Sequence, residues 1–164
     1  MSDSYVIPDG ADIGHVHLKV SSIERALSFY HGVLGFKVVA RLGDRAAFIA
    51  AGSYHHHIGL NTWESRNGPP PAPGTTGLYH LAVRYPDARS LGIAVKRVIE
   101  AGVPLSGASD HGVSLSVYLH DSDGNGVELT CDAPEERWPK TESGEINLYL
   151  GQPLDLENLL AHAS

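Results

Sequence analysis

Residues 110–129 of the chain read DHGVSLSVYLHDSDGNGVEL and carry its clearest fold signal. Asp121–Asn125 is a run of turn-forming residues, because glycine and asparagine accept positive φ and short polar side chains bond their own backbone. The segments on either side are β-branched or apolar, as paired strands require. The stretch therefore predicts a β-hairpin with Tyr118 on one strand and Glu128 on the other.

Composition sets limits on the class of protein. The chain has 164 residues, of which 42% are hydrophobic and 19% charged, and this balance is typical of a folded globular domain. A net charge of -7 without a basic run argues against a nucleic-acid or anionic-membrane partner. No apolar stretch approaches the roughly 20 residues that cross a bilayer, and the N-terminus lacks the pattern of a signal peptide. The single cysteine, Cys131, suits a reducing compartment, so we expect a cytoplasmic protein.

Outward from the hairpin, the same order of elements is predicted twice. The elements of residues 13–66 follow the order βαβββ: Ile13–Val20, Ser21–Leu34, Phe36–Leu42, Ala46–Ala51 and His55–Thr62. Those of residues 78–131 repeat the order: Leu78–Tyr85, Asp87–Ala101, Leu105–Ala108, Val113–His120 and Gly126–Cys131. The sequence thus predicts one α+β domain made of two paired βαβββ modules.

The sequence also predicts three segments outside the modules and the residues that begin the first helix. The predicted segments are an N-terminal arm (1–12), a Pro/Gly linker (67–77) and a tail with a short Asp155-capped helix (132–164). Ser21 and Glu24 have the spacing of a capping box at the start of the first helix. The tail is expected to serve packing or a subunit contact.

Ten histidines are the unusual feature of the composition, and the repeat selects among them. Aligning the first strands of the two modules places His15 over His80, whereas His17 falls on Ala82. Two equivalent histidines and one carboxylate, Glu128 on the last strand, form the donor set of a facial triad. Such a site holds non-haem Fe(II) and leaves three coordination positions open. The sequence therefore predicts a metal centre at these three residues.

The motifs also resemble a known superfamily. HVHLKVSSIERALSFYHGVLGF, GLYHLAV and HDSDGNGVEL look like the vicinal oxygen chelate (glyoxalase, bleomycin resistance and extradiol dioxygenase) superfamily over about residues 13–131. YHHHIGLNTW, DHGVSLSVYLHD and PLDLENLL are further similar to single-domain relatives of catechol 2,3-dioxygenase. The resemblance implies a glyoxalase-like fold, in which the modules form a cupped, incomplete β-barrel around the metal.

By position, the resemblance also implies roles for individual residues. The iron ligands fall on the three residues already selected, His15, His80 and Glu128. The substrate-contacting histidine and tyrosine fall on His111 and Tyr118.

The acid–base histidine of the family falls on His56. Strand alternation would turn His55 and His57 to the opposite face, although a slip of one residue would exchange them.

The activity implied by the resemblance is extradiol ring cleavage of a catechol-type vicinal diol, with Fe(II) as cofactor and O2 as co-substrate. Such an enzyme would serve aromatic catabolism as a homodimer or higher homo-oligomer, with Mn(II), Zn(II) or Ni(II) as alternative metals. A glyoxalase-like lyase or isomerase stays open, although it normally needs a carboxylate in the fourth strand, His55–Thr62, which has none. A histidine of 55–57 could still supply that ligand. A metal-free drug-binding protein is the other alternative, although such proteins usually lack the ligand histidines.

Overall fold

The computed structural model describes residues 4–148 and 151–163, so the first three residues of the arm and residues 149, 150 and 164 of the tail lie outside it. The elements of the first module are β1 (Val16–Lys19), α1 (Ile23–Leu27), the π-helical η1 (Ser28–Val33), β2 (Lys37–Leu42), β3 (Ala46–Ala50) and β4 (Ile58–Asn61). Those of the second are β5 (Leu81–Arg84), α2 (Ala88–Glu100), β6 (Leu105–Asp110), β7 (Ser114–His120) and β8 (Gly126–Asp132). The tail adds the 3₁₀ turn η2 (Glu135–Arg137), β9 (Gln152–Pro153) and α3 (Leu156–Ala161).

The strands form two sheets and confirm the predicted duplication. The first sheet has the order β1-β4-β3-β2, and the second has the order β5-β8-β7-β6-β9. In each module the first strand pairs in parallel with the last, β1 with β4 and β5 with β8, and the other pairs are antiparallel. The fold is therefore α+β with two sheets, not a closed barrel. The short strand β9, which extends the second sheet, was not predicted.

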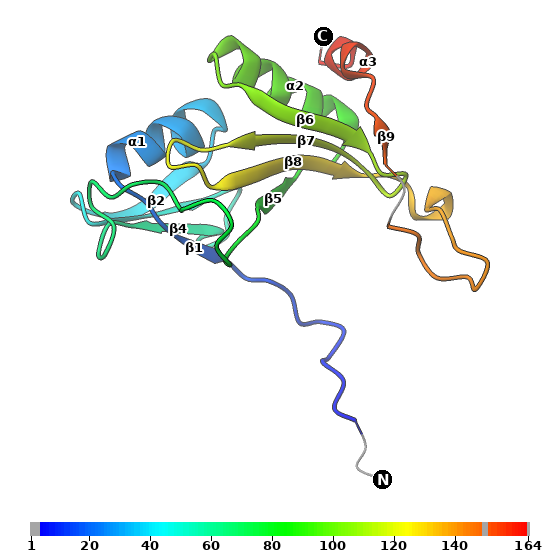
Figure 1. Cartoon of the computed structure of the whole chain (residues 1–164), viewed down its shortest axis with the longest axis horizontal. Helices are drawn as coiled ribbons and strands as arrows, with labels where there is room; N and C mark the ends of the chain where they lie inside the picture. The colour runs from blue at the N-terminus through cyan, green and yellow to red at the C-terminus, as the bar shows by residue number, and fades with distance from the viewer. Residues whose placement is uncertain (1–3, 149–150, 164) are drawn as a thin grey trace.

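Both long helical segments lie on the same side of the sheets, so the opposite faces are left uncovered (Figure 1). Helix α2 buries Leu91, Val95 and Val98 in the core that it shares with β8, because these residues recur at helical spacing. Cys131 lies in the same core. In the described part of the chain, no helix is both long and apolar enough to cross a membrane.

The start of the first helix differs from the prediction. Ser22, not Ser21, caps α1, because its side chain accepts the N–H of Arg25. The hydroxyl of Ser21 instead donates to Asp123 in the β7–β8 turn of the other module. The capping-box prediction was wrong because a contact about 100 residues away in sequence takes the Ser21 side chain.

Polar contacts join the two modules on the helix side, one of them buried and the others exposed. The hydroxyl of Tyr30, on η1, donates to Asp121 Oδ2 at 2.9 Å, and both residues are buried. Arg97, on α2, donates to the carbonyls of Gly32 and Val33 at the end of η1, each at 2.9 Å. Unpaired buried polar groups are costly, so the Tyr30–Asp121 bond in particular sets how the modules stand relative to one another. We call this set of contacts the helix-side joint.

Candidate metal centre

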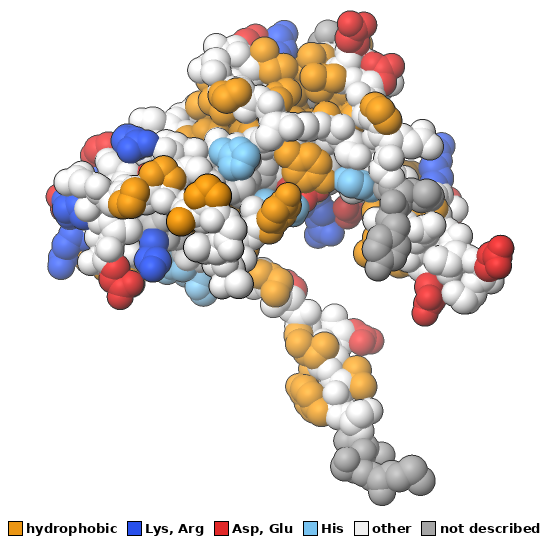
Figure 2. Space-filling model, viewed as in Figure 1, with side chains coloured by type: hydrophobic (Ala, Val, Ile, Leu, Met, Phe, Trp, Pro, Cys, Tyr) orange, Lys and Arg blue, Asp and Glu red, His pale blue; other side chains and the backbone are white. Residues whose placement is uncertain are grey.

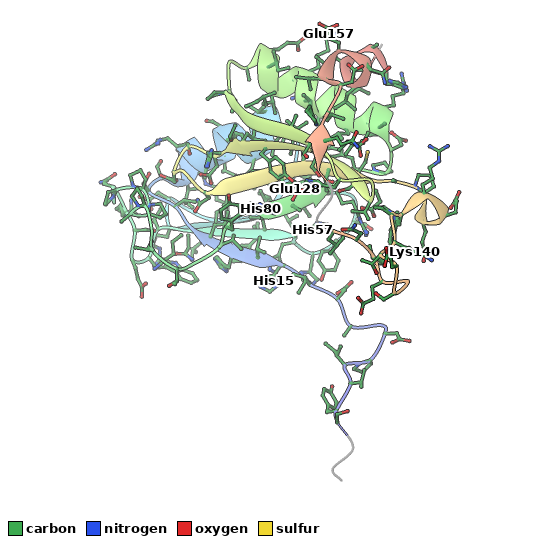
Figure 3. All side chains as sticks on the ribbon, turned by 45° about the vertical axis from the view of Figure 1, so that its right-hand side comes forward. His15, His57, His80, Glu128, Lys140 and Glu157 are labelled. Atoms are coloured by element: carbon green, nitrogen blue, oxygen red, sulfur yellow. The ribbon has the colours of Figure 1, made fainter. Side chains whose placement is uncertain are left out.

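His80 and Glu128 lie together on the uncovered face of the second sheet. His80 immediately precedes β5, and Glu128 lies on the neighbouring strand β8. The two side chains meet with His80 Nε2 2.9 Å from Glu128 Oε2 (Figure 3). Two donors that each lie about 2.1 Å from one metal ion stand roughly 3 Å apart when they take neighbouring positions. The pair therefore has the spacing and the chemistry of two metal ligands.

Tyr118 and His111 stand beside this pair. Tyr118, on β7, is paired directly with Glu128 in the β7–β8 ladder, and its ring lies 5.8 Å from that of His80. Its hydroxyl is 2.7 Å from His111 Nε2. Burial, followed by the charge of Glu128, raises the pKa of the Tyr118 phenol, so the group is protonated at neutral pH. These four residues form what we call the second-module cluster.

His15 lies on the other sheet. It immediately precedes β1 as His80 precedes β5, so the two histidines hold equivalent places in the repeat. His15 and His80 line one cavity of about 560 Å³ between the edges of β1 and β5. Across residues 4–148 and 151–163, however, no three His, Cys, Asp or Glu side chains stand close enough to share a metal ion. The three predicted ligands suit Fe(II) by donor type, but the structure joins only two of them.

The histidines at 55–57 lie in the bend before β4, so strand alternation does not decide which of them faces the site. Contacts separate them instead. His56 packs on His15, with ring centroids 4.4 Å apart, and on Phe48 at 5.2 Å. His57 lines the cavity that His15 and His80 share. Burial, then the neighbouring His15 and His55, lowers the pKa of His56, which favours a neutral ring at neutral pH.

The strand registers show which residues replace the second-module cluster in the first module. Glu128 is paired with Tyr118, and in the first module Gly59 is paired with Phe48. Gly59 is thus the counterpart of Glu128, and Phe48 is the counterpart of Tyr118. A Cβ atom at Gly59 would lie 2.8 Å from His17 Nδ1, because the His17 ring fills this space. The first module therefore has neither a carboxylate nor free space at the place of a fourth ligand.

Arg84 is a site residue that the sequence interpretation missed. It lines the same cavity and forms an ion pair with Asp132 at 3.1 Å. The available signal was strand alternation, since residues 80, 82 and 84 lie on one face of β5 and its lead-in.

Residues 12–129 match the profile of the Glyoxalase/Bleomycin resistance protein/Dioxygenase superfamily. The chain is 37% identical over 158 residues to the Catechol-2,3-dioxygenase of Bacillus subtilis (strain 168), covering 96% of this chain and 54% of that protein. It is 30% identical to Biphenyl-2,3-diol 1,2-dioxygenase 3 of Rhodococcus globerulus (76% and 66%). It is 25% identical to the Iron-dependent extradiol dioxygenase of Rhodococcus jostii (strain RHA1) (84% and 49%).

The chain spans between about half and two thirds of the length of these curated relatives. Among solved structures, a glyoxalase/dioxygenase from Nostoc punctiforme has the same fold, with a TM-score of 0.62 and 21% identity. The match covers 81% of this chain and all of that one.

Proposed function

Because the chain belongs to the glyoxalase/bleomycin resistance protein/dioxygenase superfamily, we propose that it is an Fe(II)-dependent extradiol dioxygenase. Its substrates would be a catechol-type vicinal diol and O2. The observation that carries the proposal is the His80–Glu128 pair at 2.9 Å, with Tyr118 and His111 hydrogen-bonded beside it. The similarity to a catechol-2,3-dioxygenase and to an iron-dependent extradiol dioxygenase supports the choice of substrate and metal.

In this proposal His15, His80 and Glu128 hold the iron. Two imidazoles and one carboxylate form the donor set that non-haem Fe(II) takes in proteins. When bound, the iron supplies a centre that holds the diol and O2 next to each other. Their reaction then becomes effectively unimolecular and does not depend on a collision in solution.

The remaining residues bind the substrate and move its protons. The protonated Tyr118 hydroxyl donates a hydrogen bond, and His111 Nε2, 2.7 Å away, orients that hydroxyl. His56 accepts a hydroxyl proton of the diol at an imidazole nitrogen and returns it after the ring opens. A positioned acid–base group of this kind contributes about 10²–10⁴ in rate.

A lyase or isomerase would need a histidine of 55–57 as its fourth ligand, and His57 lines the cavity that His15 and His80 share. That alternative normally requires a carboxylate in the strand that holds Gly59, and a carboxylate there would clash with His17.

The test is to load the protein with Fe(II) without oxygen, confirm the iron content, and add a panel of catechols followed by O2. We expect oxygen uptake and a yellow ring-opened product. Glu128→Gln should lose both iron and activity, whereas Glu157→Gln, on α3 and far from the site, should keep both (Figure 3). If the iron-loaded protein consumes no oxygen with any catechol, the proposal fails.

A further inference from the structure

We propose that the C-terminal tail positions His111, with Gly151 and Pro139 holding this histidine where it orients the Tyr118 hydroxyl. The inference rests on the proposed function for the role of His111 and adds the residues that set its geometry. From the sequence, the tail was expected to serve only packing or a subunit contact. In this proposal it is part of the site.

His111 lies outside the regular strands. It occupies the bend between β6, which ends at Asp110, and β7, which begins at Ser114. Within the bend, the His111 N–H donates to the Ser114 carbonyl at 2.9 Å, and the Gly112 N–H donates to Asp110 Oδ1 at 2.8 Å. A side chain on a loop keeps a precise place only when the surrounding structure holds it. The bend therefore depends on its neighbours to place the histidine.

The strand β9 supplies the first of these neighbours. It extends the second sheet beside β6, where Ser109 pairs with Pro153 and Asp110 pairs with Gln152. The added strand thus pairs with the last two residues before His111. It fixes the backbone from which the bend starts.

Gly151, directly before β9, lies against the histidine ring itself. A Cβ atom at Gly151 would stand 3.7 Å from His111 Nδ1 and 3.3 Å from Ser109 Oγ. The other nitrogen of the ring, Nε2, is 2.7 Å from the Tyr118 hydroxyl. The ring is therefore held between the backbone of the tail and the phenol that it orients.

A hairpin of the tail, residues 139–147, supplies the second neighbour. It is closed by the Asn147 N–H, which donates to the Pro139 carbonyl at 2.8 Å. The Pro139 ring packs on Gly112, the residue after His111, so that a Cβ atom at Gly112 would lie 3.0 Å from Pro139 Cγ. Gly112 also has a φ of 74°, which glycine adopts without strain. Glycine at this position allows both the turn and the close approach of the proline.

The start of the tail is bonded to the same bend. The Ala133 N–H donates to the carbonyl of Val113, and the Trp138 indole N–H donates to the carbonyl of Ala133, each at 2.8 Å. Pro139 follows Trp138 directly, so these bonds fix the proline relative to the bend.

The hairpin also lies on the side of the molecule that carries the candidate site. It stands on the side of the sheets that faces away from α2 (Figures 1 and 3). Figure 2 shows a hollow beneath the second sheet with the hairpin beside it. The tail therefore reaches His111 from within the surroundings of the site.

The consequence concerns the Tyr118 hydroxyl. A hydroxyl rotates about its C–O bond, so a second group has to fix the direction of its hydrogen. His111 Nε2 is that group in the proposed site. A misplacement of about 1 Å in a site can cost about 10²-fold in rate. A larger side chain at position 151 should therefore act like the loss of the histidine.

Gly151→Val tests this through the rate of catechol cleavage. Residue 151 has no positive φ, so valine adds bulk against the His111 ring without straining the backbone. We expect kcat to fall by about 10²-fold while the iron content stays at the wild-type value. Adding Gly151→Val to His111→Ala should cause no further loss, because the first change acts through the second residue. An unchanged kcat in the single variant, or losses that add, would overturn the proposal.

The matched control is Gly10→Val in the N-terminal arm. A Cβ atom there would meet no atom within 4 Å, so this variant should keep the wild-type kcat. If Gly151→Val does not fold, Pro139→Ala decides the question by the same measurements. It removes the ring atoms that pack on Gly112 and should lower kcat in the same way.

A fluorine signal provides a readout that does not depend on activity. Protein labelled with 3-fluorotyrosine has seven such residues, and Tyr118→Phe identifies the signal of Tyr118 by its absence. We expect Gly151→Val to shift this signal in the same direction as His111→Ala, and Gly10→Val to leave it in place. A Tyr118 signal that does not move in Gly151→Val overturns the proposal.

The two proposals fail in different ways. If the iron-loaded wild type cleaves no catechol but Gly151→Val moves the Tyr118 signal, the proposed function is wrong and the positioning stands. If catechols are cleaved and Gly151→Val changes neither kcat nor the signal, the positioning is wrong and the function stands.

Discussion

Removing the hydroxyl of Tyr30 should destabilise the whole chain, because this group is part of the joint between the modules. Tyr30 is fully buried, and Tyr30→Phe keeps its ring and leaves no cavity. The hydroxyl donates to a buried carboxylate, Asp121, at 2.9 Å. The variant therefore removes one hydrogen bond and little else.

The magnitude follows from the partners that Asp121 keeps. A hydrogen bond to a charged group contributes about 1.5–3 kcal/mol. Asp121 still accepts the N–H groups of Asp123 and Asn125 and the Asn125 amide, so the loss falls near the lower end of that range. We expect the free energy of unfolding to fall by about 1.5–2 kcal/mol. In a domain of this size that corresponds to a fall in Tm of roughly 3–8 °C.

Urea unfolding and scanning calorimetry measure both quantities, and Tyr85→Phe is the matched control. Burial raises the pKa of Tyr85 to about 12, yet its hydroxyl has no hydrogen-bond partner among the described residues. The control should change the free energy of unfolding by less than about 0.5 kcal/mol. The reasoning is refuted if Tyr30→Phe is no less stable than Tyr85→Phe.

Three other substitutions test separate features. Gly59→Ala should lower Tm, because the added Cβ would lie 2.8 Å from the ring of His17. Adding His17→Ala removes that ring and should restore Tm. A double variant whose Tm does not recover would contradict this contact. The backbone N–H of Ser90 lowers the pKa of Asp87 below its ordinary 3.8, so this group stabilises the fold above that pH and the contribution is lost as the pH falls through the lowered value. Asp87→Asn should flatten that acid loss in urea unfolding at pH 7 and pH 3, and an equal slope would count against the cap. Gly92→Val should detach α3, since a Cβ there lies 2.5 Å from its backbone, and limited proteolysis should then cut the C-terminus faster; unchanged cleavage would rule this out.

The two modules could be predicted from the sequence because their signals are local. The turn at Asp121–Asn125, the apolar spacing of α2 and the Asp155 cap each depend on residues within a few positions of one another, and all are present. The repeat alignment correctly gave His15 and His80 equivalent places.

The sequence-based predictions failed at positions whose structure depends on residues far away in the sequence. Ser21 is held by Asp123 across the module contact, and no local pattern reports this. The strand predicted from His55 begins only at Ile58, so the alternation that was expected to set His56 apart from His55 and His57 does not extend to these residues. How close His15 comes to Glu128 depends on how whole modules pack, and periodicity carries no information about that.

The unequal halves of the repeat have a consequence for the outcome of the proposed reaction. A perfectly symmetric site would surround both oxygens of a diol with the same groups and could not tell one end from the other. Here one half presents the carboxylate of Glu128 and the phenol of Tyr118, and the other presents the ring of Phe48 and the ring of His17, which covers Gly59. For a diol bound as proposed, the wall of the site distinguishes the two oxygens, so an unsymmetrically substituted catechol should give a single regioisomer of product.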